Sequence, residues 1–284
     1  MPTSIRRGSL PYLLIAIPAA FLLVCFVIPN AVLLSMGFIE SDDTVPTGVL
    51  TLDNFSTLFH SALYVGAILR SFEVGIGAGV IVVLLAYPLA YFLVRTTSRW
   101  KTLLIAASLT PLLASVIVRT YGWWVILNRE GAVNGLLSWL GVIDRPLALL
   151  PSTAAITIGL AHALLPYGVL TIMASLNGLN PNLERAAMSL GASRTRSFVA
   201  VTLPLSAPGI AGGFLLTFAI AISAYATPAI LGGPGTQVMA TVIRRFMLEL
   251  LDWSLGSAMG VVLLVASLIL LAATSAVSAR RTTA

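Results

Sequence analysis

Residues 182–204 read NLERAAMSLGASRTRSFVAVTLP, and this polar stretch interrupts a chain that is otherwise strongly apolar. Four charged residues fall within thirteen positions: Glu184, Arg185, Arg194 and Arg196. Long charge-free runs, 146–183 and 197–243, lie directly on either side of these charges. The stretch therefore marks a polar connection between two apolar parts of the chain.

The composition predicts a membrane protein. Of 284 residues, 58% are hydrophobic and only 9% are charged, whereas a soluble domain carries about 25% charged residues. Five runs contain no Asp, Glu, Lys or Arg: 8–39, 74–94, 146–183, 197–243 and 253–279. About 20 apolar residues cross the hydrocarbon core as a helix, and a helix satisfies its own backbone hydrogen bonds there. We therefore expect an all-α, polytopic membrane protein.

Six membrane-spanning helices fit the apolar runs, at about 10–38, 66–94, 102–127, 152–176, 207–231 and 256–279. The first run follows Arg6 and Arg7 but is too long for a cleaved signal peptide, so we expect an uncleaved anchor. This pattern divides the chain into an N-terminal tail, first helix and outer loop (1–65), a five-helix core (66–279) and a C-terminal tail (280–284).

The basic residues predict the orientation, because inner loops of membrane proteins are enriched in Lys and Arg. With both termini inside, the inner segments hold 10 of the 16 basic residues: Arg6, Arg7, Arg95, Arg99, Lys101, Arg185, Arg194, Arg196, Arg280 and Arg281. Glu184 is the only acidic residue in these inner segments. We therefore expect both termini and the stretch 182–204 on the cytoplasmic side.

Local signals predict a two-part helical elbow over residues 181–204. Asn180 is a suitable N-cap, and Pro181 fits the first helical position. Spacing places an apolar stripe on one face, made by Leu183, Ala186, Ala187 and Leu190. Gly191 is a suitable end for this helix, Ser193 can cap a second one to about Val201, and Pro204 is expected to redirect the chain. These features leave two alternatives open: a helix lying on the inner leaflet, or a docking surface for a cytoplasmic protein.

The elbow also resembles a known signature. Ala186, Ala187, Gly191 and Val201-Thr202-Leu203-Pro204 match the spacing of the cytoplasmic Glu-Ala-Ala…Gly…Ile-x-Leu-Pro motif of binding-protein-dependent ABC importer permeases. Arg185 stands where the motif has Glu, with Glu184 just before it. The stretches YPLAYFLVR (87–95), VRTYGWWVILNREGAVNGLL (118–137) and ATPAILGGPG (226–235) are similar to the spermidine/putrescine-type branch.

The resemblance implies a type I importer fold in a bacterial plasma membrane. Two permease subunits, expected to be similar but not identical, with a homodimer as the alternative, would stand on two cytoplasmic ATPases, and an external binding protein would deliver the solute. Contact with the ATPase is then expected from the elbow, through Leu183, Glu184, Arg185, Ala186, Ala187, Leu190, Gly191, Leu203 and Pro204.

The sequence lacks the motifs that indicate nucleotide-binding, metal-binding or nucleic-acid-binding sites. A phosphate-binding loop needs Gly-Lys-Ser/Thr, but the only lysine, Lys101, follows Trp100. Two histidines, His60 and His162, are too few and too far apart for a metal site, and the scattered basic residues do not resemble a nucleic-acid surface. We therefore expect a transport subunit that is not an enzyme and that needs no cofactor, metal or nucleic acid.

Residues of the translocation path are suggested by the stretch Ser223-Ala224-Tyr225-Ala226-Thr227-Pro228. Tyr225 and Thr227 can line a path, and His162 is a further candidate, with a hydrogen-bonded interior residue as the alternative. Polyamine permeases often carry an acid before this aromatic residue, where Ala224 stands here. A polyamine is the expected solute, and opines, amino-acid derivatives and other small organic solutes stay open.

Charged residues within the apolar segments have structural explanations. Arg70 and Glu73 lie three residues apart and can form an ion pair, and Arg119 can reach the outer interface. Two other classes of function remain as alternatives to the importer. An ion-gradient-driven transporter would need ionisable groups near the bilayer centre, and a non-transporting assembly or sensor subunit would carry no solute.

Overall fold

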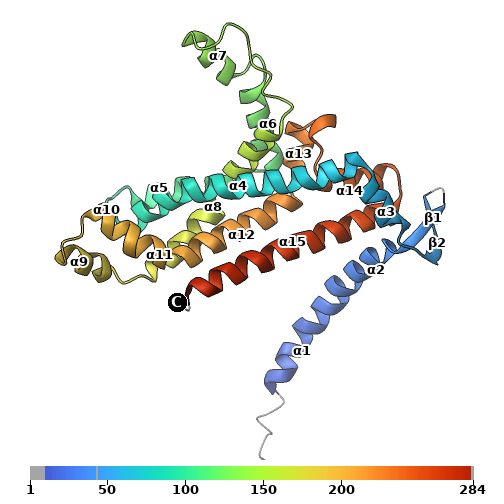
Figure 1. Cartoon of the computed structure of the whole chain (residues 1–284), viewed down its shortest axis with the longest axis horizontal. Coiled ribbons are helices and arrows are strands. Elements are labelled where there is room, and N and C mark those ends of the chain that lie inside the picture. Colours follow the sequence, from blue (N-terminus) through green and yellow to red (C-terminus); the bar gives the residue numbers. More distant parts are fainter. Residues whose placement is uncertain (1–9, 43, 283–284) are drawn as a thin grey trace, which may run out of the picture. The chain divides into compact units, whose positions relative to one another are not determined.

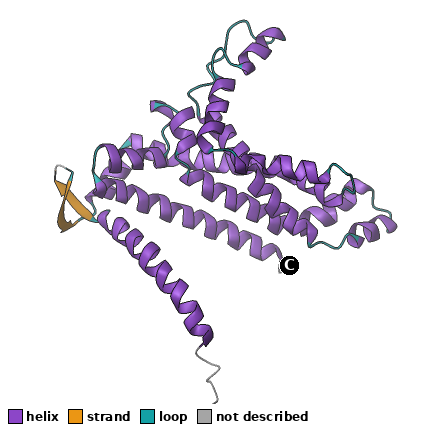
Figure 2. Ribbon diagram, turned by 180° about the vertical axis from the view of Figure 1, so that it is seen from behind, coloured by secondary structure: helices purple, strands orange, loops and turns teal. Residues whose placement is uncertain are grey.

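The computed structural model describes residues 10–42 and 44–282, so the predicted N-terminal tail with Arg6 and Arg7 lies outside the described residues. Nearly all of this part is helical, with one two-stranded hairpin (Figure 2). Its residues group into two units, Met1–Ser61 with Ile243–Leu264, and Ala62–Val242 with Val265–Ala284. The division into an N-terminal part (1–65), a five-helix core (66–279) and a C-terminal tail (280–284) stays a prediction.

The first unit holds the N-terminal helix and a hairpin. The helix continues through one π-helical turn, and antiparallel strands follow it: α1 (Leu10–Leu22), η1 (Leu23–Val27), α2 (Ile28–Met36), β1 (Ile39–Asp42) and β2 (Val45–Leu50). The unit also contains α3 (Asp53–His60), η4 (Arg245–Glu249) and the start of α15 (Trp253–Thr282). The sequence predicted a loop from residue 39, not a hairpin. Asn54 supports it by donating to the carbonyls of Gly37 and Ile39 at 3.1 and 2.9 Å.

The second unit is built around three packed helices, α4 (Ala62–Arg95), α8 (Thr153–Asn177) and α12 (Ala207–Ser223) (Figure 1). The other elements of this unit are α5 (Lys101–Leu113), α6 (Val116–Leu127), α7 (Ala132–Trp139), α9 (Asn182–Ser189), α10 (Arg194–Ser197), η2 (Phe198–Thr202), α11 (Leu203–Leu205), α13 (Ala226–Leu231), η3 (Pro234–Thr236) and most of α14 (Met239–Arg244). The elbow lies at one end of the three-helix bundle and α13 at the other.

Small residues let the three helices approach closely. A Cβ on Gly168 would lie 2.4 Å from Val82 Cγ1, and one on Gly209 would lie 2.3 Å from Ser175 Cβ. Gly75 and Gly79 similarly lie against the rings of Phe218 and Phe214. Inside a bilayer no hydrophobic effect drives helices together, so membrane helices associate through close packing of this kind. Gly75 and Gly79, four positions apart on α4, thus let this helix pack closely against α12.

In the described part of the chain, four helices are long and apolar enough to cross a membrane, and there are up to six if each of two bent pairs is one span. The four long helices lie within the predicted spans 10–38, 66–94, 152–176 and 256–279 or extend them by a few residues.

The third predicted span, 102–127, is not one straight helix. It divides into α5 and α6, with a bend of 99° between Lys101–Leu113 and Val116–Trp139. Ala114 and Ser115 are extended at the break, which frees the carbonyl of Pro111 from its partner in a continued helix. Arg119 donates to this carbonyl. Arg119 therefore supports the bend, and its position at the outer interface stays a prediction.

The fifth predicted span, 207–231, is also broken. α12 ends at Ser223, α13 begins at Ala226, and Ala224 has an extended backbone with ψ 129°. Pro228 lacks the N–H that would bond the Ala224 carbonyl in a continuous helix, which explains the position of the break.

The predicted ion pair between Arg70 and Glu73 is wrong. Arg70 Nε instead donates to the carbonyl of Gln237 at 2.8 Å. Gln237 lies in extended backbone between η3 and α14, so its carbonyl has no helical partner and the guanidinium satisfies it. Ion pairs in the described part of the chain are Arg95–Glu184 and Arg244–Glu249.

Candidate coupling site and translocation path

The first arm of the elbow has well-defined ends. Asn180 Oδ1 accepts from the backbone N–H of Asn182 at 2.9 Å, which confirms the predicted cap. At the other end, Gly191 has φ +90°. Its N–H donates to Met188 O at 3.0 Å, and that of Ala192 donates to Ala187 O at 3.1 Å. These two bonds form a Schellman motif, which satisfies the last carbonyls of the helix and turns the chain.

The second arm continues further than predicted. Ser193 Oγ accepts from the N–H of Arg196 at 3.3 Å and starts the arm. α10, η2 and α11 then follow without interruption to Leu205, and the axis bends by 59° into α12. The sequence placed this change of direction at Pro204. The π-helical turn of η2 precedes Pro204 and accommodates its missing N–H, so the bend falls at Ser206 instead.

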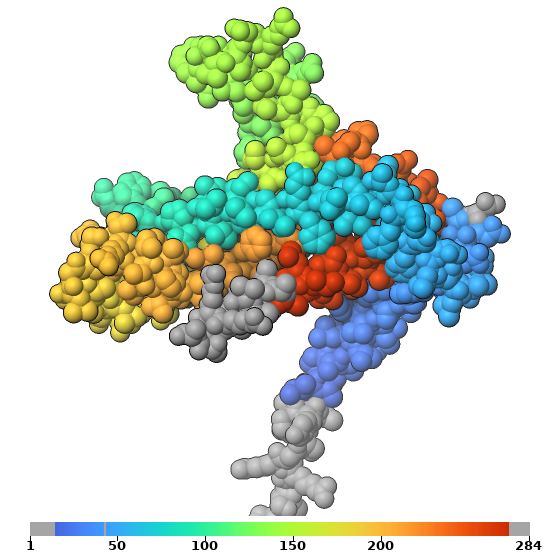
Figure 3. All heavy atoms as spheres, viewed as in Figure 1, coloured from blue at the N-terminus to red at the C-terminus, as the bar shows by residue number. Residues whose placement is uncertain are grey.

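The predicted apolar stripe faces outward. Leu183 is 45% exposed and Leu190 90% exposed; Ala186 is exposed and Ala187 half-buried. Figure 3 shows the elbow, coloured yellow to gold, as a protruding end of the second unit. Leu203 is packed against the hydrophobic core, while Pro204 is exposed. An apolar surface at a polar end of a helix bundle is suited to contact with another protein.

Glu184 points into the second unit and not outward with the stripe. Its Oε1 atom lies 3.0 Å from Arg95 Nη2 at the end of α4, and the two side chains are 18% and 25% exposed. Thr202 Oγ1 donates to the same carboxylate oxygen, and Ser197 Oγ donates to the backbone carbonyl of Glu184 at 3.1 Å. The carboxylate therefore joins both arms of the elbow to α4.

Aromatic side chains extend this junction along α4. The Arg95 guanidinium lies 5.9 Å from the ring centre of Tyr91. Phe198 packs edge-on against Tyr91 and Tyr87, with ring centres 5.1 and 5.9 Å apart. Tyr87 Oη also lies 2.8 Å from Ser206 Oγ, at the bend into α12. The elbow is thus fixed to α4 at successive turns, and a displacement of the elbow would act on α4 and α12 together.

Sequence reasoning missed this junction. Glu184 and Arg95 are separated by 89 positions, and no local pattern connects them. One signal was available: Glu184 is the only acid of the predicted inner segments, so a basic partner on a neighbouring inner helix end was to be expected.

Two of the three predicted path residues are brought together around α6. Thr227 is 3% exposed, and its Oγ1 lies 3.1 Å from that of Thr120. His162 is exposed, and its Nδ1 accepts from Trp123 Nε1 at 3.2 Å. Thr120 and Trp123 lie one turn apart on α6, so α6 connects the two predicted residues. Tyr225 is 37% exposed at the break between α12 and α13.

This region carries positive charge and no negative charge. Arg119 lies one turn before Trp123 on α6 and acts electrostatically on His162. No Asp or Glu occurs in α6, α8, α12 or α13. Among the described residues, no group of three His, Cys, Asp or Glu side chains could hold a metal ion.

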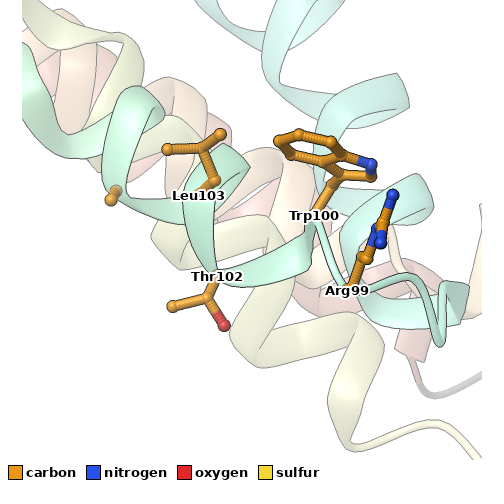
Figure 4. Close-up of a pocket in the computed structure, with 5 residues that line it drawn as sticks. Arg99, Trp100, Thr102 and Leu103 are labelled. Atoms are coloured by element: carbon orange, nitrogen blue, oxygen red, sulfur yellow. The ribbon is translucent and has the colours of Figure 1, made fainter.

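A separate open hollow of ≈ 730 Å³ lies at the start of α5. Figure 4 shows Arg99 and Trp100 beside each other at its edge, with Thr102 and Leu103 on the following turn. The Arg99 guanidinium lies 5.5 Å from the Trp100 ring centre. This pairing is typical of the membrane–water interface, and the hollow contains none of the predicted site residues.

Comparison with known proteins identifies the family. No protein-family model matches the chain. The spermidine/putrescine transport system permease protein PotB of Salmonella typhimurium is 33% identical over 243 residues, which cover 85% of this chain and 84% of the relative. PotB of Escherichia coli strain K12 is also 33% identical, over 85% of this chain and 88% of the relative.

The chain belongs to the ABC importer permeases, in the spermidine/putrescine-type branch. The fold agrees with this assignment. A bacterial alginate ABC transporter, crystallised with an alginate pentasaccharide-bound periplasmic protein, contains a chain that matches with a TM-score of 0.79 and 21% identity. The match covers 97% of this permease and 96% of that chain. This permease is thus a multi-pass membrane protein with the type I importer fold, as the elbow signature predicted.

Proposed function

We propose that this permease works with a second, similar but non-identical permease, two cytoplasmic ATPases and an external solute-binding protein in a bacterial inner membrane. Family membership supports this assembly, and the related alginate transporter was crystallised with its periplasmic protein. The main support for the proposal is the arrangement of the elbow: its apolar stripe is exposed, while the carboxylate of Glu184 is paired with Arg95 of α4. Residues 66–279 would form the permease core, with both termini cytoplasmic as the basic residues suggest.

The junction suggests how ATP would drive transport. ATP binding would draw the two ATPases together, and the stripe of Leu183, Ala186, Ala187 and Leu190 would move with them. Arg95–Glu184 and the ring of Phe198 would pass this displacement to α4, a rigid helix of 34 residues. α12 would follow through Ser206, and the bundle would change from inward- to outward-facing. ATP hydrolysis would return it after the solute has entered.

The proposed solute is a polyamine, because PotB relatives are named for spermidine and putrescine. The rings of Trp123 and Tyr225 could hold an ammonium group by cation–π contact. Ala224 replaces the acid of other polyamine permeases, so this site would use aromatic faces in place of a countercharge.

One observation favours a second solute class, a carboxylate-bearing compound such as an opine or amino-acid derivative. Because His162 Nδ1 accepts from Trp123, the neutral ring carries its proton on Nε2 and can donate there. Arg119 supplies further donors, and no acid lies on α6, α8, α12 or α13. A set of donors without a negative charge suits a carboxylate.

Uptake by proteoliposomes tests the proposal. Full-length permease is purified with the subunits encoded beside it and supplied with the binding protein, ATP and labelled spermidine or octopine. We expect uptake and ATP hydrolysis that both depend on the binding protein. Uptake that continues without ATP and stops with an uncoupler would identify an ion-gradient-driven transporter. Absence of flux for every solute that the binding protein binds would identify a non-transporting subunit.

A further inference from the structure

The hollow at the start of α5 has a polar end and an apolar end. At the polar end, Arg99 and Trp100 lie beside each other (Figure 4), with the guanidinium 5.5 Å from the ring centre. Trp100, Leu103 and Ala106 follow at intervals of three residues, so they continue along one face of the helix. Trp100 and Leu103 are 55% and 56% exposed. The hollow therefore offers a cation, an aromatic ring and an apolar face in succession.

The charge beside this hollow is positive. Residues 74–129 contain no Asp or Glu, while Arg99 and Lys101 lie at the beginning of α5. Glu184 reaches the end of α4, but its carboxylate is paired with Arg95. Neither Arg99 nor Lys101 forms an ion pair with another residue in the described part of the chain. Both cations are thus available to an anionic group from outside the chain.

The position of the hollow favours a lipid over a soluble anion. Residues 74–94 and 102–118 contain no charged residue, so the short connection between α4 and α5 lies where two apolar segments leave the membrane. Basic and tryptophan side chains at such a place meet phospholipid headgroups, and basic pockets beside membrane helices bind anionic ones. A soluble anion would leave Trp100, Leu103 and Ala106 uncovered. A phospholipid matches both ends of the hollow.

We propose that the hollow at the start of α5 binds one anionic phospholipid, with the phosphate at Arg99 and an acyl chain along Leu103 and Ala106. Lys101 adds positive charge near the headgroup, and Trp100 lies at the level of the ester groups. The lipid belongs to the leaflet that the connection between α4 and α5 faces, which is the inner leaflet in the proposed orientation. The inference rests on the proposed function for this orientation alone.

Quenching of tryptophan fluorescence by brominated lipids tests the site, because Trp100 lines the hollow itself. Full-length permease in a neutral detergent is titrated with phosphatidylglycerol or phosphatidylcholine that carries bromine on its acyl chains, and Trp100→Phe defines the part of the signal that belongs to Trp100. We expect phosphatidylglycerol to quench this part at an at least about tenfold lower mole fraction, since two cations face its headgroup and each contributes about fivefold. Equal quenching by the two lipids would overturn the proposal.

Substitution of single arginines locates the headgroup. Arg99→Gln should weaken phosphatidylglycerol binding by about fivefold and change phosphatidylcholine binding by less than about twofold. Arg194→Gln is the matched control, because Arg194 is an exposed arginine of the elbow that does not line the hollow; it should change binding by less than about twofold. An equal loss in both variants would show general attraction to a basic surface, and the proposal would fail.

The apolar end of the hollow and the source of the anion are tested in the same assay. Leu103→Gln should weaken phosphatidylglycerol binding by at least about threefold, because it removes apolar contact with the acyl chain. Inorganic phosphate at about 10 mM, compared with NaCl at the same ionic strength, should not relieve the quenching. Relief by phosphate would identify a site for a soluble anion, and full binding by Leu103→Gln would show that no acyl chain lies there; either result contradicts the proposal.

The same titration of the permease together with the subunits encoded beside it shows whether the site is open in the assembled importer. We expect the quenching of Trp100 to be unchanged; its loss would show that another subunit covers the hollow, and the proposal would fail. Lipid binding needs neither ATP nor solute. A permease that binds phosphatidylglycerol at Arg99 but transports nothing would therefore refute the proposed function and leave the lipid site standing.

Discussion

Replacement of Gly191 tests whether the shape of the elbow matters for coupling. Gly191 has φ +90°, and a Cβ added there would meet no heavy atom within 4 Å. A side chain at this position therefore causes no steric clash, and the whole effect of a substitution comes from the backbone conformation. For an L-residue in the left-handed region this cost is about 1–2 kcal/mol, which lowers the equilibrium constant between the observed turn and its alternatives by about five- to thirtyfold. The conformational free energy of this turn is higher still for a β-branched residue such as valine.

Uptake and ATPase association in proteoliposomes measure this effect. Gly191→Val should abolish ATPase association or solute uptake while membrane insertion stays normal, and Gly191→Ala should reduce them by no more than about five- to thirtyfold. Gly191→Asn is the matched control, because asparagine tolerates the left-handed region; it should keep most activity. Gly135→Ala, at another position with open space but without a positive φ, should have no effect. Normal uptake by Gly191→Val would refute the role of the turn.

Four further substitutions test contacts within the second unit. Gly168→Ala should lower the melting temperature, because its methyl group would overlap Val82 Cγ1 at 2.4 Å and overpacking costs about 1–3 kcal/mol; unchanged stability would contradict the close approach of α4 and α8. Asn134→Ala removes the side-chain hydrogen bonds of Asn134 to the carbonyls of Asn128 and Leu147 and from the N–H of Leu147. Amide hydrogen exchange in residues 128–147 should therefore become faster, while exchange in the three-helix bundle stays slow. Thr227→Val should lower the free energy of unfolding by about 1 kcal/mol. In a double-mutant cycle, Thr227→Val together with Thr120→Val should lower it by less than the sum of the two single effects. Strict additivity would show that the two hydroxyls do not interact.

The sequence predicted the long helices and the elbow well because their signals are local. Absence of charge over 20 or more residues is enough to indicate α4, α8 and α15. The cap at Asn180 and the turn at Gly191 follow from the preferences of single residues.

The positions of the helix breaks could not be predicted from local sequence signals. Pro88 and Pro166 lie inside α4 and α8 without ending them, whereas Pro111 and Pro228 lie beside breaks. A proline in a membrane helix is tolerated wherever neighbouring groups satisfy the freed carbonyl. At the break after α5, the contact of Arg119 with the Pro111 carbonyl became visible only in the structure. For Glu184 the sequence indicated a basic partner but did not identify Arg95, which lies 89 positions away.

Crosslinking from the tip of the elbow tests the central claim most directly. Leu190→Cys in a chain that also carries Cys25→Ala, to remove the one native cysteine, places a single thiol on the most exposed part of the stripe. We predict that a short bifunctional reagent joins this thiol to the ATPase in the assembled importer, with a yield that changes on ATP binding. Labelling from the external side, or no crosslink to the ATPase in an importer that transports solute, would contradict the claim that a motor subunit acts on the elbow.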